Sequence, residues 1–262
     1  MRRKGYAHFS TSGVPRSAGS NRVTMAAALG ASEVHIWSRS LEAAPPDVAA
    51  HASVLSPDER ARANRFRFDD DRRRFVIGRS VLRQILGDYL CLPADRLTFS
   101  YDDYGKPRLE RAAGGPPLFF NASHSHDLAL YAIAPVDGVG IDVERVRAMT
   151  DVESIARRFF APREQSALAA LQGDAKTEAF FRCWTRKEAI LKAVGAGFSL
   201  PLNSVDVPIA SDTLPCVVRL PHTISDIHDW SLHDARPPAD YIGAVALPGD
   251  GWHVVYLPSH DA

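Results

Sequence analysis

The clearest candidates for chemistry are two carboxylates in the segment Val139-Gly-Ile-Asp-Val-Glu144. Side chains alternate between the two faces of a strand, so Asp142 and Glu144 share one face and Ile141 lies on the other. Neighbouring carboxylates repel each other unless a cation lies between them, and Mg²⁺ binds one or two carboxylates together with phosphate oxygens. Gly140 is expected to leave that face open just before the acids. The pattern predicts a metal site; the alternative is a half-buried strand with a solvated polar face.

A third acid and a lysine follow about forty residues later, in a strongly helical stretch. Trp184, Glu188 and Lys192 are spaced four residues apart, which places them on one face of a helix. A Glu–Lys pair at this spacing is also a common surface pair of helices, worth a few tenths of a kcal/mol, and this is the alternative. Together with the first two acids, the pair completes a set suited to a metal ion and a pyrophosphate.

The elements that must position these residues follow from periodicity and capping. Ser56 is a good N-cap and Pro57 suits a first helical turn, so a helix is expected over 56–66. Polar Ser123-His-Ser-His126 is expected to join the two strands of a hairpin. The other expected elements are a helix at 70–90 and strands at 34–37, 96–101, 118–121 and 127–134.

A faint internal repeat indicates two related lobes. Residues 127–138 (DLALYAIAPVDG) and 240–251 (DYIGAVALPGDG) share Asp, Pro, Asp and Gly at an offset of 113. At the same offset, Arg73-Arg74…Arg79 falls opposite Arg186-Lys187…Lys192. Four identities are few, but they favour two α+β lobes packed face to face, with the seam between them as the site.

The composition is that of a soluble globular protein: 262 residues, 45% hydrophobic and 24% charged. Lys plus Arg and Asp plus Glu both number 31, so no global field attracts nucleic acid or an acidic membrane. The apolar runs are shorter than a membrane span, and three separated cysteines indicate a reducing, cytoplasmic compartment. Residues 1–32, basic and without acids, are expected to be a disordered tail or an overextended start, with a transit peptide as the alternative.

Four motifs in a fixed order make the sequence similar to a known family. The motifs are Y-G-K-P at 104–107, F-N-A-S-H at 120–124, V-G-I-D-V-E at 139–144 and W-T-R-K-E-A-I-L-K at 184–192. The chain resembles the Sfp-type 4′-phosphopantetheinyl transferases, and the lobe lengths agree with this from about 34 to 257. The resemblance implies an α+β fold of two pseudo-twofold-related lobes in one chain, here 33–136 and 137–258.

The resemblance also implies the activity and its residues. Such enzymes move the phosphopantetheine arm of CoA onto a serine of an apo acyl or peptidyl carrier protein and release 3′,5′-ADP. They need Mg²⁺, with Mn²⁺ as a possible substitute. The implied metal ligands are Asp142, Glu144 and Glu188, and the implied catalytic lysine is Lys192. The implied CoA contacts, to which Asp142 and Lys192 also belong, are Arg62, Arg74, Lys106, Ser123 and His124.

Physical reasoning supports these contacts, because CoA carries a 3′-phosphate and a pyrophosphate and a neutral protein must gather cations locally to bind them. The alternatives are a solvated Arg-rich helix and, for His124 with His126, a metal pair that lacks a third ligand. Glu59 is a departure, because relatives often have a basic residue there, and this puts the preference for CoA over dephospho-CoA in doubt.

Glu188 is the expected general base, with Glu144 as the alternative. A duplicated chain needs no second subunit to complete its site, so a monomer is expected. The rival function is a non-catalytic CoA-binding or carrier-binding member of the same fold. The sequence does not identify the carrier protein or its pathway.

Overall fold

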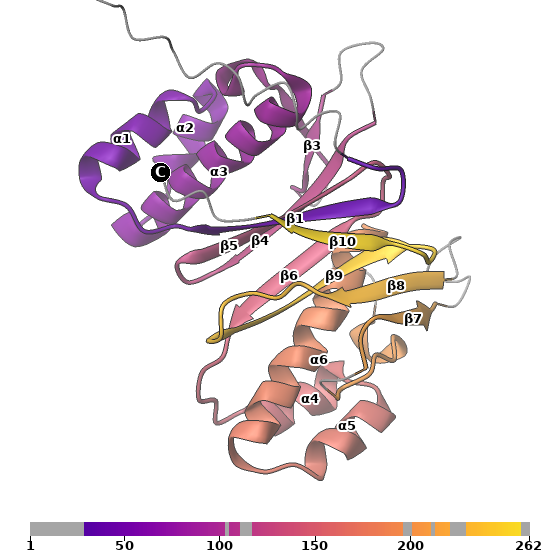
Figure 1. Cartoon of the computed structure of the whole chain (residues 1–262). Coiled ribbons are helices and arrows are strands. Elements are labelled where there is room, and N and C mark those ends of the chain that lie inside the picture. The colour runs from indigo at the N-terminus through magenta and orange to yellow at the C-terminus, as the bar shows by residue number, and fades with distance from the viewer. Residues whose placement is uncertain are drawn as a thin grey trace, which may run out of the picture.

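Two four-stranded sheets packed face to face form the centre of the molecule in the computed structural model (Figure 1). The structure describes residues 29–102, 105–110, 117–195, 201–210, 213–220 and 229–257. The first sheet has the spatial order β10 (His253–Leu257), β1 (Glu33–Ser40), β5 (Leu128–Ala134) and β4 (Phe119–Ser125). The second has the order β6 (Gly140–Arg145), β9 (Tyr241–Pro248), β8 (Asp229–Asp234) and β7 (Cys216–Arg219). A small separate sheet consists of β2 (Phe99–Tyr101) and β3 (Pro107–Leu109).

Helices cover the outer face of each sheet (Figure 1). Those on the first sheet are α1 (Pro45–Ser53), α2 (Pro57–Ala63) and α3 (Asp69–Leu90). Those on the second are α4 (Val152–Phe159), α5 (Pro162–Ala169) and α6 (Gly173–Val194). Short 3₁₀ turns occupy Ala94–Arg96 and Leu202–Ser204. The prediction of an α+β fold with two similar lobes is confirmed.

Because side chains alternate between the two faces of a strand, β5 contributes residues to two hydrophobic cores. Tyr131 and Ile133 face outward into the core beneath α3, whereas Leu130 and Ala132 face inward. The inward residues meet side chains of β6 and β9 in a central core between the sheets. The seam between the lobes is therefore a hydrophobic interface, and it holds the two halves of the molecule in fixed register.

The last strand departs from the expected division of the chain at 136. β10 follows the second lobe in sequence but pairs in parallel with β1 of the first sheet, from Glu33↔His253 to Trp37↔Leu257. A parallel partner for β1 requires a long crossover, and the connection here includes the rest of the first lobe and nearly all of the second. Residues 253–257 thus tie the end of the second lobe to the first. Residues 1–28 of the expected tail lie outside the described residues.

The repeat is present in the strands but has a different offset in the helices. β5 and β9 occupy corresponding places, each bonded to the first strand of its lobe. However, α3 and α6 both have 22 residues and begin 104 residues apart, so the basic residues aligned at an offset of 113 are not equivalent. Loops of unequal length between helix and strand account for the difference.

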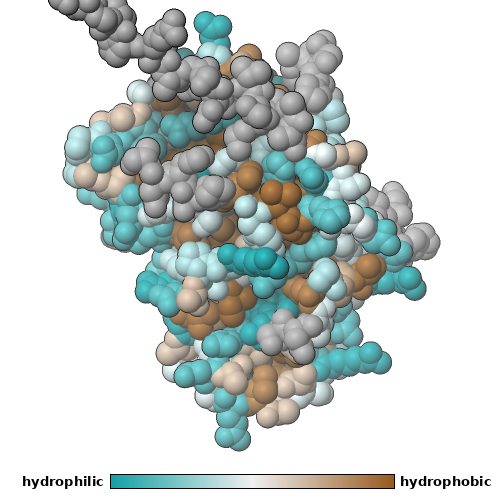
Figure 2. Space-filling view, viewed as in Figure 1, coloured by the Kyte–Doolittle hydropathy of each residue, from teal (hydrophilic) through white to brown (hydrophobic). Residues whose placement is uncertain are grey.

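The hairpin connection is shorter than predicted. Ser123, His124 and Ser125 are part of β4, and the turn to β5 consists of His126 and Asp127, with His126 at φ 52°. Polar residues continue the strand because the Ser123 and Ser125 side chains bond to acids of the second lobe, whereas His124 lies on the other face, exposed and in the wall of a cavity. Among the described residues, no helix is long and apolar enough to cross a membrane. Figure 2 shows hydrophilic residues over most of the visible face, with hydrophobic residues in separate patches.

Candidate active site

Asp142 is the buried centre of the acidic site. Its side chain is 7% exposed, and Oδ1 accepts hydrogen bonds from the Ser123 hydroxyl (2.8 Å) and the Lys192 ammonium (2.6 Å). The ammonium also donates to Ser123 Oγ (3.0 Å) and to the Ile141 carbonyl (3.2 Å). Asp142 Oδ2 is buried and has no hydrogen-bond partner. A charged oxygen in that position is free to bind a further cation.

Glu144 lies two residues further along β6, on the same face, as the alternation predicts. Its Oε2 accepts a hydrogen bond from Ser125 Oγ at 2.8 Å and lies 3.8 Å from Arg147 Nη1. The carboxylate is 29% exposed, so it is accessible to a ligand at the mouth of the seam.

Glu188 approaches the same acids from α6. Burial raises its pKa, the charges of Asp142 and Glu144 raise it further, and Lys192 opposes them. Burial and like charge make the ionised carboxylate less stable, which makes Glu188 a better proton acceptor than a solvated glutamate. The structure therefore brings Glu188 and Lys192 of one helix face against the two acids of β6.

Gly140 permits this approach, although not by leaving an open face as expected. A Cβ at Gly140 would collide with the Ala189 carbonyl and the Ala193 amide of α6. The absent side chain lets the helix backbone pack directly on β6. The glycine thus sets the distance between the strand that carries two acids and the helix that carries the third.

The three acids have the oxygen ligands that a hard divalent cation binds, but their side chains do not surround a common point in this structure. Within the described ranges, no three His, Cys, Asp or Glu side chains surround a common point as metal ligands. The Lys192 ammonium occupies Asp142 Oδ1 instead. The unpartnered Asp142 Oδ2 and the mutual repulsion that raises the pKa of Glu188 both favour the addition of positive charge. Carboxylate oxygens are the ligands that Mg²⁺ prefers.

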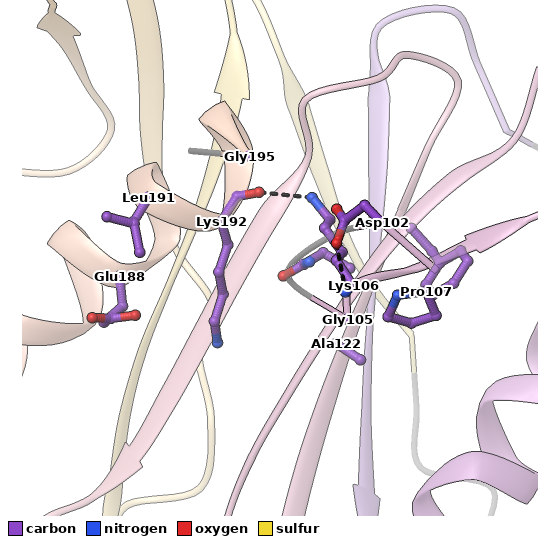
Figure 3. Close-up of a pocket in the computed structure, with 11 residues that line it drawn as sticks. Asp102, Gly105, Lys106, Pro107, Ala122, Glu188, Leu191, Lys192 and Gly195 are labelled. Carbon is purple, nitrogen blue, oxygen red and sulfur yellow. Dashed lines mark hydrogen bonds between the residues drawn. The ribbon is translucent and has the colours of Figure 1, made fainter. Parts of the chain in front are cut away.

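A cavity of about 360 Å³ opens between the lobes beside these residues. Figure 3 shows Glu188, Leu191 and Lys192 of α6 on one side of it and the turn before β3 on the other. Lys106 of this turn donates from Nζ to the Lys192 carbonyl at 2.7 Å, and its amide is held by Asp102 Oδ1 at 2.9 Å. Lys106 thus caps the last turn of α6 from the other lobe, a contact that its motif alone did not indicate.

A second, basic cavity of about 260 Å³ lies on the other side of the same turn. Its wall includes Arg62, Arg74 and His124, three of the predicted CoA contacts. Arg74 donates from Nε to Asp127 Oδ1 at 3.0 Å, and the Arg62 guanidinium lies over the Phe75 ring. Burial and the cations Lys192 and Arg74 lower the pKa of His124. Lys106 lines the first cavity, Ser123 faces β6 as well as this cavity, and Tyr104 lies outside the described residues.

Glu59 is a buried carboxylate that pairs with two arginines of α3. Arg79 Nε lies 3.5 Å from Glu59 Oε1, and Arg79 lines this cavity. The Glu59 carboxylate accepts from the Ser56 amide at 3.0 Å, which closes the N-terminus of α2, and from Arg83 Nε at 2.7 Å. The Glu59 and Arg83 side chains are each 1% exposed. The second lobe repeats the device, because Glu164 caps α5 and lies 2.7 Å from Lys187 Nζ. Glu59 thus has a structural role that the motif comparison did not indicate, and its effect on the preference for CoA over dephospho-CoA stays a prediction.

Two further residues of the seam were not predicted. Asn121 Oδ1 accepts from the Ile141 amide at 2.9 Å, and Ser125 accepts from the Arg145 amide at 3.1 Å while it donates to Glu144. The alternation of Asn, Ser and Ser along 121–125 is the signal that could have identified them. The hairpin prediction concealed it, because a connecting loop has no alternating faces.

Comparisons with known proteins agree with this geometry. Residues 138–246 match the family described as the 4′-phosphopantetheinyl transferase superfamily, and 40–136 match the description "4′-phosphopantetheinyl transferase, N-terminal". The 4′-phosphopantetheinyl transferase HetI of Nostoc sp. is 40% identical over 84% of this chain and 90% of its own. The 4′-phosphopantetheinyl transferase Sfp of Bacillus subtilis is 33% identical over 61% of this chain and 69% of its own. The human L-aminoadipate-semialdehyde dehydrogenase-phosphopantetheinyl transferase is 26% identical over 79% of this chain and 72% of its own.

Proposed function

The chain belongs to the 4′-phosphopantetheinyl transferase superfamily, and we propose that it moves the phosphopantetheine arm of CoA to a serine of an apo acyl or peptidyl carrier protein with the acids at the lobe seam. As a member it is a holo-[carrier protein] synthase, an enzyme that modifies carrier proteins. The observation that carries the assignment of the site is the meeting of Asp142, Glu188 and Lys192 beside a basic cavity.

In the proposed reaction, the carrier serine oxygen attacks the β-phosphorus of CoA. A new P–O bond forms to serine, the bond to the bridging oxygen breaks, and 3′,5′-ADP leaves with the electron pair. The serine proton passes to the Glu188 carboxylate, whose raised pKa suits it to accept a proton. The Lys192 ammonium stabilises the negative charge that grows on the leaving pyrophosphate oxygen.

Mg²⁺ is the proposed cofactor, held by Asp142, Glu144 and Glu188. When bound, it would neutralise phosphate charge and align the pyrophosphate. Lys192 already provides positive charge at Asp142, and its three donors are shared among Asp142, Ser123 and the Ile141 carbonyl. A phosphate oxygen must replace at least one of these acceptors when it contacts Lys192.

The basic cavity is the proposed site of the CoA nucleotide. Arg62, Arg74 and His124 line it, and guanidinium groups suit phosphate oxygens in both charge and planar geometry. The Arg74–Asp127 pair fixes the direction of one guanidinium rather than neutralising the site, because Arg73 also contacts Asp127 at 3.1 Å. The turn that carries Lys106 separates this cavity from the one beside Glu188, so a single CoA molecule could extend from one to the other.

A carrier protein is the proposed partner, and the helices of the second lobe provide a candidate surface. Carrier proteins are typically acidic helical bundles, so exposed arginines are suitable contacts. Arg157 and Arg158 are exposed on α4, and Arg163 is exposed on α5. The sequence Phe-Ser-Leu-Pro at 198–201 is a further candidate for this surface, and its residues 198–200 lie outside the described residues.

Intact mass spectrometry of apo carrier proteins tests the proposed function. Acyl and peptidyl carriers are incubated with the enzyme, CoA and Mg²⁺, and the mass of one phosphopantetheine arm should be gained. EDTA and a carrier Ser→Ala substitution should each abolish the gain. Asp142→Asn should abolish it as well. If CoA binds but no carrier in a panel gains mass, the chain is a non-catalytic member of the fold.

A further inference from the structure

We propose that Ser125 is a positioning residue that holds Glu144 in the acidic site, an inference that rests on the proposed function of that site. Ser125 lies on β4 of the first lobe, whereas Glu144 lies on β6 of the second. The Ser125 side chain therefore connects the two lobes at Glu144, a predicted metal ligand whose side chain is 29% exposed.

The geometry determines the direction of the Ser125 hydroxyl. One edge of β6 pairs with β9, so the amides on its other edge need different acceptors. Ser125 Oγ accepts the Arg145 amide at 3.1 Å, which commits an oxygen lone pair. The O–H donates to Glu144 Oε2 at 2.8 Å, whereas the alternative partner, His126 Nδ1, lies farther from Oγ, at 3.4 Å. Because Ser125 is only 8% exposed, water does not compete freely for this donor.

Glu144 needs such a restraint because a half-exposed cation lies near the same carboxylate oxygen that Ser125 contacts. Arg147 Nη1 is 3.8 Å from Glu144 Oε2, and its side chain is 50% exposed. Asp142 has an equivalent restraint, since Ser123 donates to its Oδ1 from the same strand. Two serines spaced two residues apart on β4 thus hold two acids spaced two residues apart on β6. Without Ser125, Glu144 is expected to turn toward Arg147 and solvent.

Metal affinity measures this role without turnover. Binding of Mn²⁺ in the presence of CoA is followed by electron paramagnetic resonance for native protein and for Ser125→Ala. Loss of a residue that orients a metal ligand typically costs about 10–100-fold in metal affinity. We expect a loss in that range, with the affinity for CoA in the absence of metal unchanged. Ser125→Thr, which retains a hydroxyl, should recover most of the affinity.

Ser231→Ala is the matched control. Ser231 is also a buried serine on a strand, and its hydroxyl donates to the Leu247 carbonyl, but β9 separates it from β6. It should bind Mn²⁺ as native protein does. Native affinity in Ser125→Ala would overturn the proposal.

A double-mutant cycle shows whether Ser125 acts through Glu144. In a Glu144→Gln background, Ser125→Ala should have little further effect on Mn²⁺ binding. A full additional loss would overturn the positioning role and leave the proposed function intact. If Glu144→Gln itself leaves Mn²⁺ affinity native, the metal assignment fails and the role of Ser125 fails with it, whereas transfer to carrier proteins would still be observed.

Discussion

At the scale of single residues, Glu188 is poised by its surroundings to take a proton. Burial and two neighbouring carboxylates raise its pKa, so its ionised form is costly and its basicity is increased. The same repulsion indicates that this residue serves activity at the expense of stability, as active-site residues often do.

Glu188→Gln should abolish most transfer without unfolding the protein. The amide keeps the shape but cannot accept the serine proton, and loss of a general base typically lowers a rate by about 10²–10⁴-fold. The thermal midpoint should be equal to or above that of native protein, because one repelling charge is removed. Rates come from intact mass spectrometry and midpoints from calorimetry. Near-native transfer would show that Glu188 is not the base.

Lys106→Met tests a residue for which motif and structure point to different roles. The motif implies a contact with CoA, whereas the ammonium caps α6 at the Lys192 carbonyl. If capping dominates, kcat should fall several-fold while KM for CoA changes little, because Lys192 loses its restraint. Arg62→Ala, in the basic cavity, should instead raise KM for CoA. Steady-state kinetics on both variants distinguish the roles, and a rise in KM alone for Lys106→Met would support the CoA contact.

At the scale of elements, the approach of α6 to β6 forms the acidic site. The two elements can come together only because Gly140 has no side chain. A strand with two acids and a helix with one acid and one lysine would otherwise be separated by a layer of side chains.

Gly140→Ala should therefore destabilise the fold and separate the acids. Overpacking of a close contact costs about 1–3 kcal/mol, and here the neighbours are backbone atoms that cannot rotate away. Gly78→Ala, inside α3, is the matched control. A Cβ at Gly78 would make only ordinary contacts, at 3.6 Å, with the side chains of Leu41 and Tyr131. That change should be neutral or stabilising by up to about 1 kcal/mol. Urea denaturation measures both; equal stabilities would contradict the close-packing argument.

The buried pair between α2 and α3 gives a second prediction at this scale. Glu59→Ala leaves Arg83 buried without its partner and removes the cap of α2, which typically costs about 3–5 kcal/mol. The KM ratio for CoA and dephospho-CoA should change little in whatever fraction stays folded, because in the basic cavity Glu59 pairs with Arg79 and not with Arg62 or Arg74, the proposed phosphate contacts. A shift in that ratio would restore the idea that Glu59 weakens binding of the 3′-phosphate.

At the scale of the whole molecule, the described residues join the lobes through several kinds of contact. The hydrophobic core between the sheets is continuous, β10 returns from the second lobe to pair with β1, and β4 side chains bond to β6. The acidic site spans this joint, so its geometry depends on both lobes. A change in the packing of either lobe should be transmitted to the metal ligands.

Stability should decrease as the pH falls below about 6.5, the ordinary pKa of a histidine side chain. Burial lowers the pKa values of His35, His51, His124 and His233 in the folded protein. Between the folded and the unfolded pKa values, the unfolded chain binds more protons, so acid favours unfolding. Glu188 acts in the opposite sense at lower pH, because its pKa is raised in the folded state.

The measurement is urea denaturation at several values between pH 8 and pH 5. The free energy of unfolding should be nearly constant above pH 7 and fall below it. His35→Gln should reduce the pH dependence, since the ring is buried against Tyr89, with 2.5 Å between Nδ1 and the hydroxyl oxygen. Stability that is flat or rises toward pH 5 would contradict the assignment.

Much of the site could be predicted from the sequence, because local periodicity determines local placement. The alternation of a strand placed Asp142 and Glu144 on one face of it, and a spacing of four residues placed Glu188 and Lys192 on one face of a helix. Ordered motifs identified the family. The two placements depend on chain segments shorter than twenty residues, in which the geometry of a strand or helix is regular, whereas the motifs extend over residues 104–192.

Only the tertiary structure decided what lies opposite these faces. It pairs Lys192 with Asp142 and Arg83 with Glu59, and it forms the hydrogen bonds from Lys106 to the end of α6 and from Ser125 to Glu144. Each of these contacts joins residues 19 to 86 positions apart, beyond the reach of any local period. It also returned β10 to the first sheet. The sequence by itself determined which residues could do the chemistry, and the packing of two lobes determined which of them meet, because strand and helix periods specify a face but not its partner.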